Sequence, residues 1–342
     1  MQNENVKPEK KMSTRNTIQI NVISEKTKRS FKTRLITSII IAIICIPALL
    51  LGDWFFAALL LFASIVGSLE FINVLKTKKH PIWIDIFTFF MTLTFIYWAM
   101  FKNYMQNGEL INSFGHILIS DILISTLGFS VLICGLFLAS IMSSKFTVAD
   151  VCYYFTMSLF FSLSIQAMHF LRFSPMSSIT NGYDYGGNQI ASCCLFAYMI
   201  IGSFGSDIGA YAIGILFGKH KMNPRISPNK TWEGFFGGVV ISFVLSFTFA
   251  MVLSSCNIPL LKGVLDHEHW YWLLIISLVM PIVSVMGDFI FSAIKRYYDI
   301  KDFSNILPGH GGILDRIDSV LVTSLFVTIL ILTINYFPFG IF

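Results

Sequence analysis

Long apolar segments with almost no charge dominate this 342-residue sequence. A transmembrane helix needs about 20 mostly apolar residues to cross a hydrocarbon core of about 30 Å. Only 13% of the residues are charged, well below the roughly 25% of a typical soluble domain. These features argue against a soluble enzyme, a disordered chain or a secreted disulfide scaffold. They predict an all-α integral membrane protein with about nine transmembrane helices, over residues 35–51, 54–75, 81–101, 117–142, 151–173, 191–217, 234–254, 271–294 and 317–337.

Basic residues are distributed unevenly between the two sides of these helices. The polar segment 1–34 is rich in Lys and Arg, and among the later loops only Lys102, Arg172 and Lys262 would lie on the opposite side from it. Because cytoplasmic loops collect Lys and Arg, we expect a cytoplasmic N-terminus and a C-terminus outside. No small-residue cleavage site follows the first apolar segment, which favours a retained helix over a cleaved signal peptide. The net charge of +5 therefore indicates topology rather than nucleic-acid binding.

The six cysteines lack the paired spacing of a zinc site or a disulfide framework. We interpret them as packing or lipid-facing residues.

Ionisable groups at membrane depth are costly, so the places where they gather deserve a functional hypothesis. The first is the stretch 202–211 in the sixth predicted helix. Gly202, Gly205 and Gly209 allow another helix or a ligand to come close to the backbone, while Asp207 and Tyr211 share a face. Either a packing seam or a functional acid explains this stretch.

The second stretch is the loop 218–234, which carries four cations. The hydroxyls of Ser227 and Thr231 and a helix start just after Pro228 would complete a polyphosphate site, with free backbone N–H groups at the helix N-terminus. The alternative is a basic loop that only sets the topology. The cations are Lys219, Lys221, Arg225 and Lys230.

The third stretch, 288–318, is the richest in charge. On a continuous helix, an acid, a hydroxyl, a cation and a second acid would line one stripe leaving the bilayer, at Asp288, Ser292, Lys295 and Asp299. A polar, glycine-rich turn follows. A structural network of ion pairs is the alternative, but retaining so many charges beside a bilayer without a ligand would be costly.

Asp315 and Asp318 begin the last helix and share a face, so together they can bind a hard divalent cation such as Mg²⁺. Gly311 and Gly312 let the backbone approach an anion. Carboxylates for a metal, cations for phosphate and glycine-rich turns at one membrane face indicate phosphoryl or nucleotidyl transfer on a lipid.

At these residues the sequence resembles the phosphatidate cytidylyltransferase (CDP-diacylglycerol synthase) family. The resemblance is sharp from about Ser203 to Ser319. Its signature is followed at Ser292, Lys295, Arg296, Lys301, Asp302, Ser304, Leu307, Pro308, His310, Gly311, Gly312, Asp315, Arg316 and Asp318. The stretches 206–211 and 227–234 also look like recurrent stretches of that family. The resulting division is a basic cytoplasmic tail (1–34), N-terminal transmembrane helices (35–190) and a catalytic transmembrane region (191–342).

The resemblance implies that CTP and phosphatidate react to CDP-diacylglycerol and pyrophosphate with Mg²⁺, and leaves open whether a monovalent cation joins it. It implies Asp288 and Asp315 as main metal ligands, supported by Asp207 and Asp318. Lys230, Lys295, Arg296 and Arg316 would hold phosphate oxygens, and His310 would donate to a phosphate or simply shape the turn. The remaining substrate-binding candidates are Ser227, Thr231, Ser292, Lys301, Asp302, Gly311 and Gly312, of which Ser292 and Asp302 would orient other groups.

Two other functions remain as alternatives. A CTP-dependent lipid kinase of the polyprenol kind would release CDP, and a transporter would line a path with its intramembrane acids. The acids cluster toward one face, which favours a reaction chamber open to the cytoplasm. Besides CTP and phosphatidate, membrane lipids are the expected partners, nucleic acid is not, and a homodimer is left open. A bacterial plasma membrane is favoured, with the endoplasmic reticulum as the location in a eukaryote.

Overall fold

A computed structural model describes residues 25–75, 80–105, 119–173, 189–261 and 264–336. Of the predicted basic tail (1–34), residues 1–24 lie outside the described residues, and residues 25–34 belong to the first helix. The described part contains nine α-helices and a two-stranded hairpin. The helices are α1 (Glu25–Leu51), α2 (Asp53–Asn73), α3 (Ile82–Met105), α4 (Ile119–Met142), α5 (Val148–Phe173), α7 (Gln189–Phe217), α8 (Trp232–Ser255), α9 (Trp270–Tyr297) and α10 (Leu314–Tyr336).

The predicted all-α membrane architecture is confirmed. Six of these helices are long and apolar enough to cross a membrane, and α1, α3 and α4 contain shorter apolar stretches. Apolar side chains such as Ile43, Ile141 and Val240 point outward along the helices, as expected where lipid rather than water is the solvent. All six cysteines are free thiols, which agrees with the interpretation that they form no disulfide framework.

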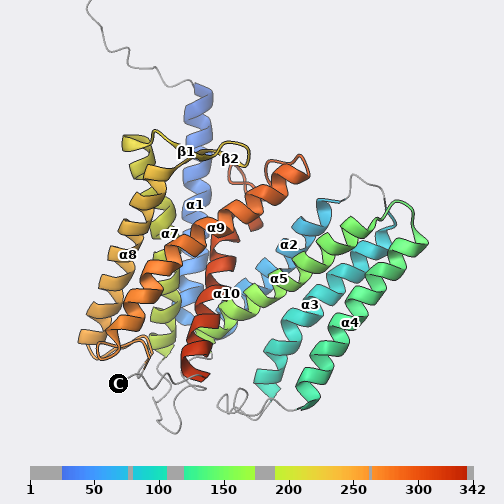
Figure 1. The fold of residues 1–342 in the computed structure, drawn as a ribbon, viewed down its shortest axis with the longest axis horizontal. Helices are drawn as coiled ribbons and strands as arrows, with labels where there is room; N and C mark the ends of the chain where they lie inside the picture. The colour runs from blue at the N-terminus through green and yellow to red at the C-terminus, as the bar shows by residue number, and fades with distance from the viewer. Residues whose placement is uncertain (1–24, 76–79, 106–118, 174–188, 262–263, 337–342) are drawn as a thin grey trace, which may run out of the picture.

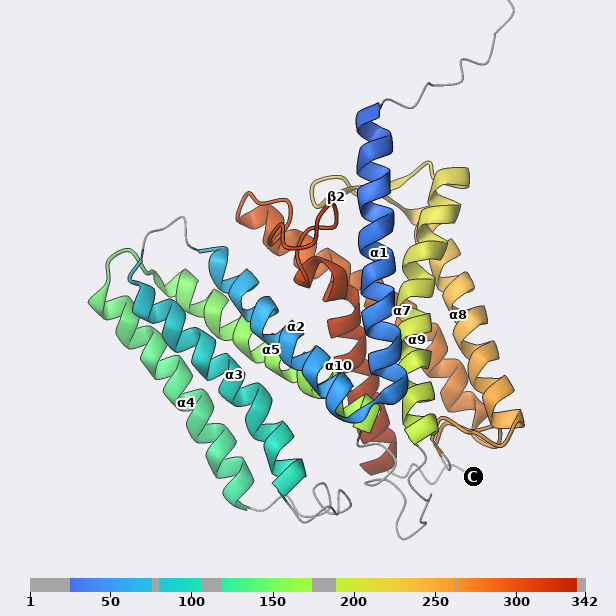
Figure 2. The ribbon, with the colours of Figure 1, turned by 180° about the vertical axis from the view of Figure 1, so that it is seen from behind.

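The polar connections lie at one end of the helix bundle. In Figures 1 and 2 the helices α2 to α5 form one flank, and α7 and α8 form the other. The hairpin, the connection between α9 and α10 and the N-terminal end of α1 all lie at the top of both views. We call this the polar end. If the Lys-rich side is cytoplasmic, the polar end faces the cytoplasm.

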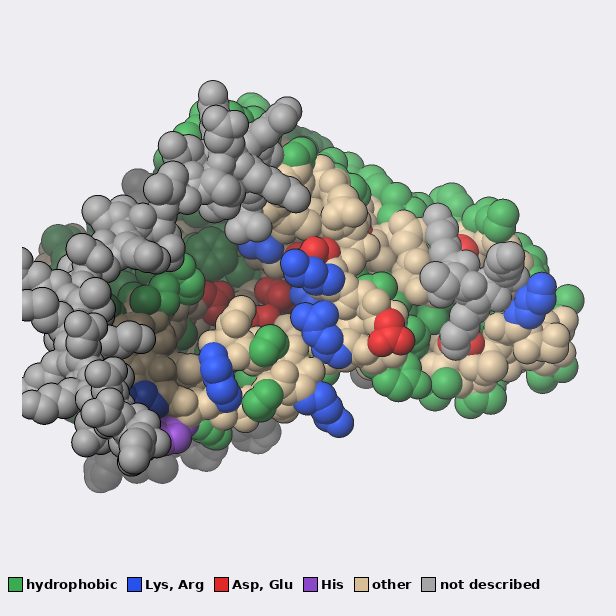
Figure 3. Space-filling model, turned by 90° about the horizontal axis from the view of Figure 1, so that it is seen from above, with side chains coloured by type: hydrophobic (Ala, Val, Ile, Leu, Met, Phe, Trp, Pro, Cys, Tyr) green, Lys and Arg blue, Asp and Glu red, His purple; other side chains and the backbone are tan. Residues whose placement is uncertain are grey.

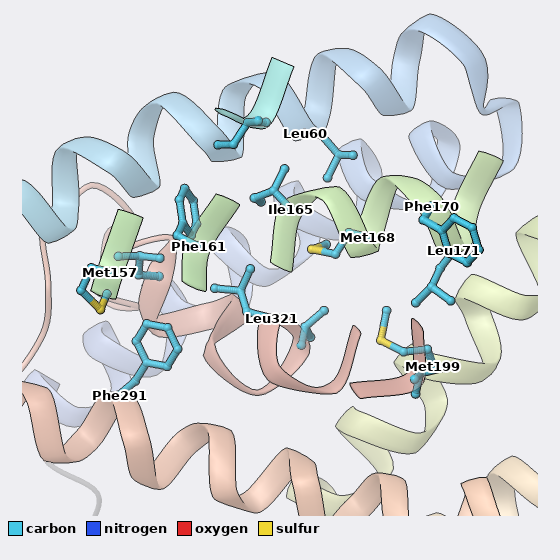
Figure 4. Close-up of a cluster of buried hydrophobic side chains, with 14 of the residues drawn as sticks. Leu60, Met157, Phe161, Ile165, Met168, Phe170, Leu171, Met199, Phe291 and Leu321 are labelled. Carbon is cyan, nitrogen blue, oxygen red and sulfur yellow. The ribbon is translucent and has the colours of Figure 1, made fainter. Parts of the chain in front are cut away.

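A buried hydrophobic cluster joins the two flanks. Leu60 from α2, Phe161 and Ile165 from α5, Met199 from α7 and Leu321 from α10 all belong to it, and Figure 4 shows them pointing into the space between these helices. Helix α5 contacts both α3 and α10. The core therefore fixes α10, which carries three of the predicted site residues, against the N-terminal helices.

The glycines of α7 form a packing seam with α8. A Cβ atom at Gly205 would lie 3.4 Å from the Cα of Ser242, and one at Gly209 would lie 3.1 Å from the Cα of Gly238. The hydroxyl of Ser242 also donates to the carbonyl of Gly202 at 2.6 Å. Small residues thus allow the two helices to approach closely, which is the packing alternative considered for this stretch.

The start of α8 differs from the prediction. Residues after Pro228 do not begin a helix, because Ser227–Thr231 form strand β2, which pairs antiparallel with β1 (Lys221–Asn223). Helix α8 begins at Trp232, with Thr231 as N-cap accepting a hydrogen bond from the Gly234 N–H. A Thr hydroxyl satisfies one of the free N–H groups of the first turn, which explains the later start.

The stripe predicted along α9 is also shorter than expected. Helix α9 ends at Tyr297, and Asp299 lies beyond it with a φ of 54°. Asp288, Ser292 and Lys295 remain on the helix, but the prediction that Asp299 continues their stripe is wrong. The backbone leaves the helix here in a left-handed turn, a conformation that Asp tolerates better than most side chains.

Candidate active site

The predicted site residues gather at the polar end of the bundle. They come from α7, from β2, from α9, from the connection 298–313 and from the first turns of α10. Figure 3 views the molecule from this end. Asp and Glu side chains lie within a hollow, and Lys and Arg side chains lie along its rim.

Asp288 on α9 is bound by groups from two elements. The Lys230 ammonium of β2 lies 2.6 Å from its Oδ2 atom, and the Ser292 hydroxyl donates to its Oδ1 atom at 3.1 Å. Lys230 also lies over the ring of Phe289, 4.5 Å from the ring centre. The hairpin therefore carries one cation of the predicted polyphosphate loop directly to the acid of α9.

Asp288 lies close to two further acids. It interacts electrostatically with Asp207 of α7 and Asp318 of α10, and these two also interact with each other. Asp207 contacts the Ser319 side chain, and Asp318 accepts from the Ser319 N–H at 2.7 Å. We call Asp207, Asp288 and Asp318 the acid cluster. Like charges this close are unfavourable unless a cation lies between or beside them, and Lys230 and Lys295 are the cations that interact with the cluster.

The Asp315 carboxylate binds one ammonium group and two backbone N–H groups. Its Oδ1 atom accepts from the Lys295 ammonium at 2.7 Å, and its Oδ2 atom accepts from the N–H groups of Phe303 at 2.8 Å and Gly312 at 3.0 Å. The Lys295 and Asp315 side chains are 10% and 2% exposed. This buried ion pair therefore fixes the C-terminal end of α9 and the polar turn to the start of α10.

The glycine-rich turn before α10 requires glycine at two positions. Gly309 and Gly311 have φ angles of 76° and 90°, which only glycine adopts readily. A Cβ atom at Gly311 would also lie 3.1 Å from Oδ2 of Asp315. The Leu307 N–H donates to the Gly311 carbonyl at 2.9 Å and closes the turn.

Glu70 of α2 is a part of this site that we did not select from the sequence. Its Oε1 atom accepts from the Ser304 hydroxyl at 2.6 Å and the Ile313 N–H at 2.8 Å, and its Oε2 atom accepts from the Leu314 N–H at 2.7 Å. A Cβ atom at Gly312 would lie 2.6 Å from Oε1. The anions that approach the backbone at Gly312 in this structure are thus the carboxylates of Glu70 and Asp315. A lone acid within an apolar window was the available signal.

Several predicted residues lie near the site without joining the acid cluster. Arg296 donates to the backbone carbonyls of Ile226 and Ile300, and the Nε2 atom of His310 lies 3.1 Å from the Ser38 hydroxyl of α1. Thr231 is buried as the cap of α8, and Ser227 is half-buried in β2. The exposed members of the predicted set are Lys301, Asp302, Arg296 and Arg316.

The acid cluster fits the donor chemistry of Mg²⁺. No three His, Cys, Asp or Glu side chains within the described residues are arranged to hold a metal ion by themselves. However, Mg²⁺ is commonly bound by one or two carboxylates together with water and substrate phosphates. Asp288 is 29% exposed and already attracts an ammonium group. Asp315 could bind a cation only through a free lone pair of Oδ1 or after releasing Lys295, so its role as a metal ligand stays a prediction.

Comparison with known proteins identifies relatives over most of the chain. The model of the cytidylyltransferase family matches residues 32–334. A phosphatidate cytidylyltransferase of Bacillus subtilis is 44% identical, over 42% of this chain and 47% of its own length, so that alignment spans about half of the relative. Those of Staphylococcus haemolyticus and Haemophilus influenzae are 30% and 28% identical, over 85% and 84% of this chain and 95% and 94% of their own lengths.

The family model begins within α1 and ends within α10, so the other helices lie wholly inside its range, which also contains every residue assigned above to the site. The resemblance inferred from the signature residues is confirmed. The chain belongs to the cytidylyltransferase family.

Proposed function

We propose that this protein is a phosphatidate cytidylyltransferase, which converts CTP and phosphatidate to CDP-diacylglycerol and pyrophosphate. The observation that carries the proposal is the acid cluster beside Lys230 and Lys295 at one end of a membrane-spanning bundle. Such a site offers oxygen ligands and positive charge to a nucleoside triphosphate next to a lipid headgroup. The names of the relatives point to the same reaction.

The reaction needs no nucleophile from the protein. A phosphate oxygen of phosphatidate attacks the α-phosphorus of CTP, and the bond from that phosphorus to the oxygen bridging to the β-phosphate breaks, which releases pyrophosphate. Lys230 and Lys295 would bind phosphate oxygens by charge-assisted hydrogen bonds. Mg²⁺, when bound at the acid cluster, would neutralise charge on the triphosphate. The rigid placement of these side chains holds the two substrates in line, which is the main catalytic contribution in such reactions.

The identity of the products tests this proposal. Purified protein with radiolabelled CTP and phosphatidate should form a cytidine-bearing lipid and one pyrophosphate per turnover, and only when Mg²⁺ is present. Release of CDP with a phosphorylated alcohol would instead support a lipid kinase. Uptake of a solute into proteoliposomes without CTP would support a transporter.

Lys230→Ala should raise the KM for CTP. The Lys230 side chain is 23% exposed and its ammonium pairs with Asp288, so we propose that it moves onto the triphosphate when CTP binds. Loss of a hydrogen bond between charged groups should raise this KM about 10- to 100-fold. Steady-state kinetics with each substrate varied would measure it. Lys221→Ala, at an exposed position of β1, is the matched control and should change this KM little. An effect confined to the KM for phosphatidate would assign Lys230 to the lipid substrate.

A further inference from the structure

We propose that Glu70 is a positioning residue for the reaction, through which helix α2 holds the polar turn and the start of α10 in their reactive arrangement. This inference rests on the proposed function and assigns a task to the N-terminal helices. Glu70 is 1% exposed, and its position in the sequence is 234 residues or more from each of its three hydrogen-bond donors.

The surroundings of Glu70 supply hydrogen-bond donors to both oxygens of its carboxylate. Its two oxygens accept three hydrogen bonds of 2.6 to 2.8 Å. In the described part of the chain no Lys or Arg forms a salt bridge with it. Two of its donors are N–H groups at the start of α10, where the helix dipole favours a negative charge. The N-terminal end of α10 therefore already binds a carboxylate of the protein itself through two backbone N–H groups.

Glu70 and Asp315 accept hydrogen bonds from neighbouring residues of the same connection between α9 and α10. Asp315 accepts from the N–H groups of residues 303 and 312, whereas Glu70 accepts from the side chain of residue 304 and the N–H groups of residues 313 and 314. Each carboxylate thus holds both ends of the connection between Phe303 and Leu314. Loss of Glu70 would leave buried N–H groups without an acceptor, which a protein avoids by moving the backbone.

Such a movement would reach the reactive groups. Asp315 is bound to Lys295, and Asp318 lies one turn further along α10 in the acid cluster. A displacement of about 1 Å in such groups can lower a rate on the order of 100-fold. Substrate binding should suffer less, because Lys230 and the hairpin are held from α8 through Glu233, which accepts from the N–H groups of Lys219 and His220.

Two variants of Glu70 with one control test the inference. Glu70→Ala removes all three acceptor contacts, and Glu70→Gln keeps the size and one acceptor oxygen. We expect kcat to fall about 100-fold in Glu70→Ala and about tenfold in Glu70→Gln, with the KM for CTP nearly unchanged. The control is Asp85→Asn on α3, a partly buried acid that binds Tyr154 and His80 in the N-terminal half and does not touch the turn. It should keep the wild-type kcat.

Hydrogen exchange provides a readout that does not depend on activity. In Glu70→Ala, and more weakly in Glu70→Gln, amides of segment 303–314 should exchange at least about tenfold faster, because two of them lose their acceptor. Amides of α3 and α8 should keep their protection. Normal kcat in both Glu70 variants, or unchanged exchange in segment 303–314, would overturn the inference. Uniformly faster exchange in all helices of both variants would also overturn it, since Glu70 would then stabilise the whole fold. Absence of CTP turnover in the wild-type protein would instead contradict the proposed function.

Discussion

Replacing Asp315 with Asn is expected to lower turnover by about 100-fold or more, while the protein remains inserted and folded in membranes. The carboxylate is the shared acceptor of Lys295 and of the Phe303 and Gly312 N–H groups. An amide has only one acceptor oxygen and would turn its NH₂ group toward another donor. Breaking a buried ion pair on one side should also lower the free energy of unfolding by about 3 kcal/mol. Turnover with CTP and phosphatidate, and unfolding by titration with detergent, would measure the two effects.

A double variant separates these effects. Lys295→Met combined with Asp315→Asn removes both charges of the pair, and replacement of a whole buried pair is often nearly neutral in stability. We therefore expect the double variant to regain most of the lost stability and none of the lost turnover. Near-normal turnover in Asp315→Asn would remove Asp315 from both the metal site and the reaction. Equal instability of the single and double variants would show that the backbone contacts, and not Lys295, account for the stability loss.

The membrane helices were predictable because each is specified locally. Within a bilayer every backbone N–H and C=O group must be paired inside the protein, and a helix does so within its own segment. The apolar window 54–75 therefore predicted α2 (Asp53–Asn73) to within two residues at each end. The predictions of the helix start after Pro228 and of the continuous stripe to Asp299 were wrong because both depend on how short polar segments fold back.

The members of the site could be selected from the sequence, but their pairing could not. Lys230 with Asp288 and Lys295 with Asp315 join residues from different elements, and spacing along one helix does not reveal such contacts. Glu70 shows the same limit more sharply. The cost of burying an acid indicates that Glu70 needs hydrogen-bond partners. Those partners lie 234 or more residues later in the sequence, in a turn whose conformation depends on tertiary contacts.

Asp288→Asn is expected to lower turnover about 100-fold and to raise the Mg²⁺ concentration needed for half-maximal rate about tenfold or more. Asp288 is the acid of the cluster that forms an ion pair with Lys230, and its side chain is 29% exposed. Because removal of this carboxylate also relieves its repulsion with Asp207 and Asp318, which offsets the lost ion pair, this variant should be nearly as stable as the wild type. Asp288→Asn and Asp315→Asn should therefore differ in stability although both lose turnover.

The Mg²⁺ dependence distinguishes two roles of Asp288. As a metal ligand, its replacement should weaken binding of Mn²⁺, used as a paramagnetic substitute for Mg²⁺ in the presence of CTP, by about tenfold or more. As a partner that only orients Lys230, its replacement should instead raise the KM for CTP and leave Mn²⁺ binding unchanged. Ser292→Ala is the matched control, because it removes the 3.1 Å hydrogen bond to Asp288 but leaves the carboxylate in place. Its effect on Mn²⁺ binding should be smaller than that of Asp288→Asn, and an equal effect would argue against Asp288 as a direct ligand.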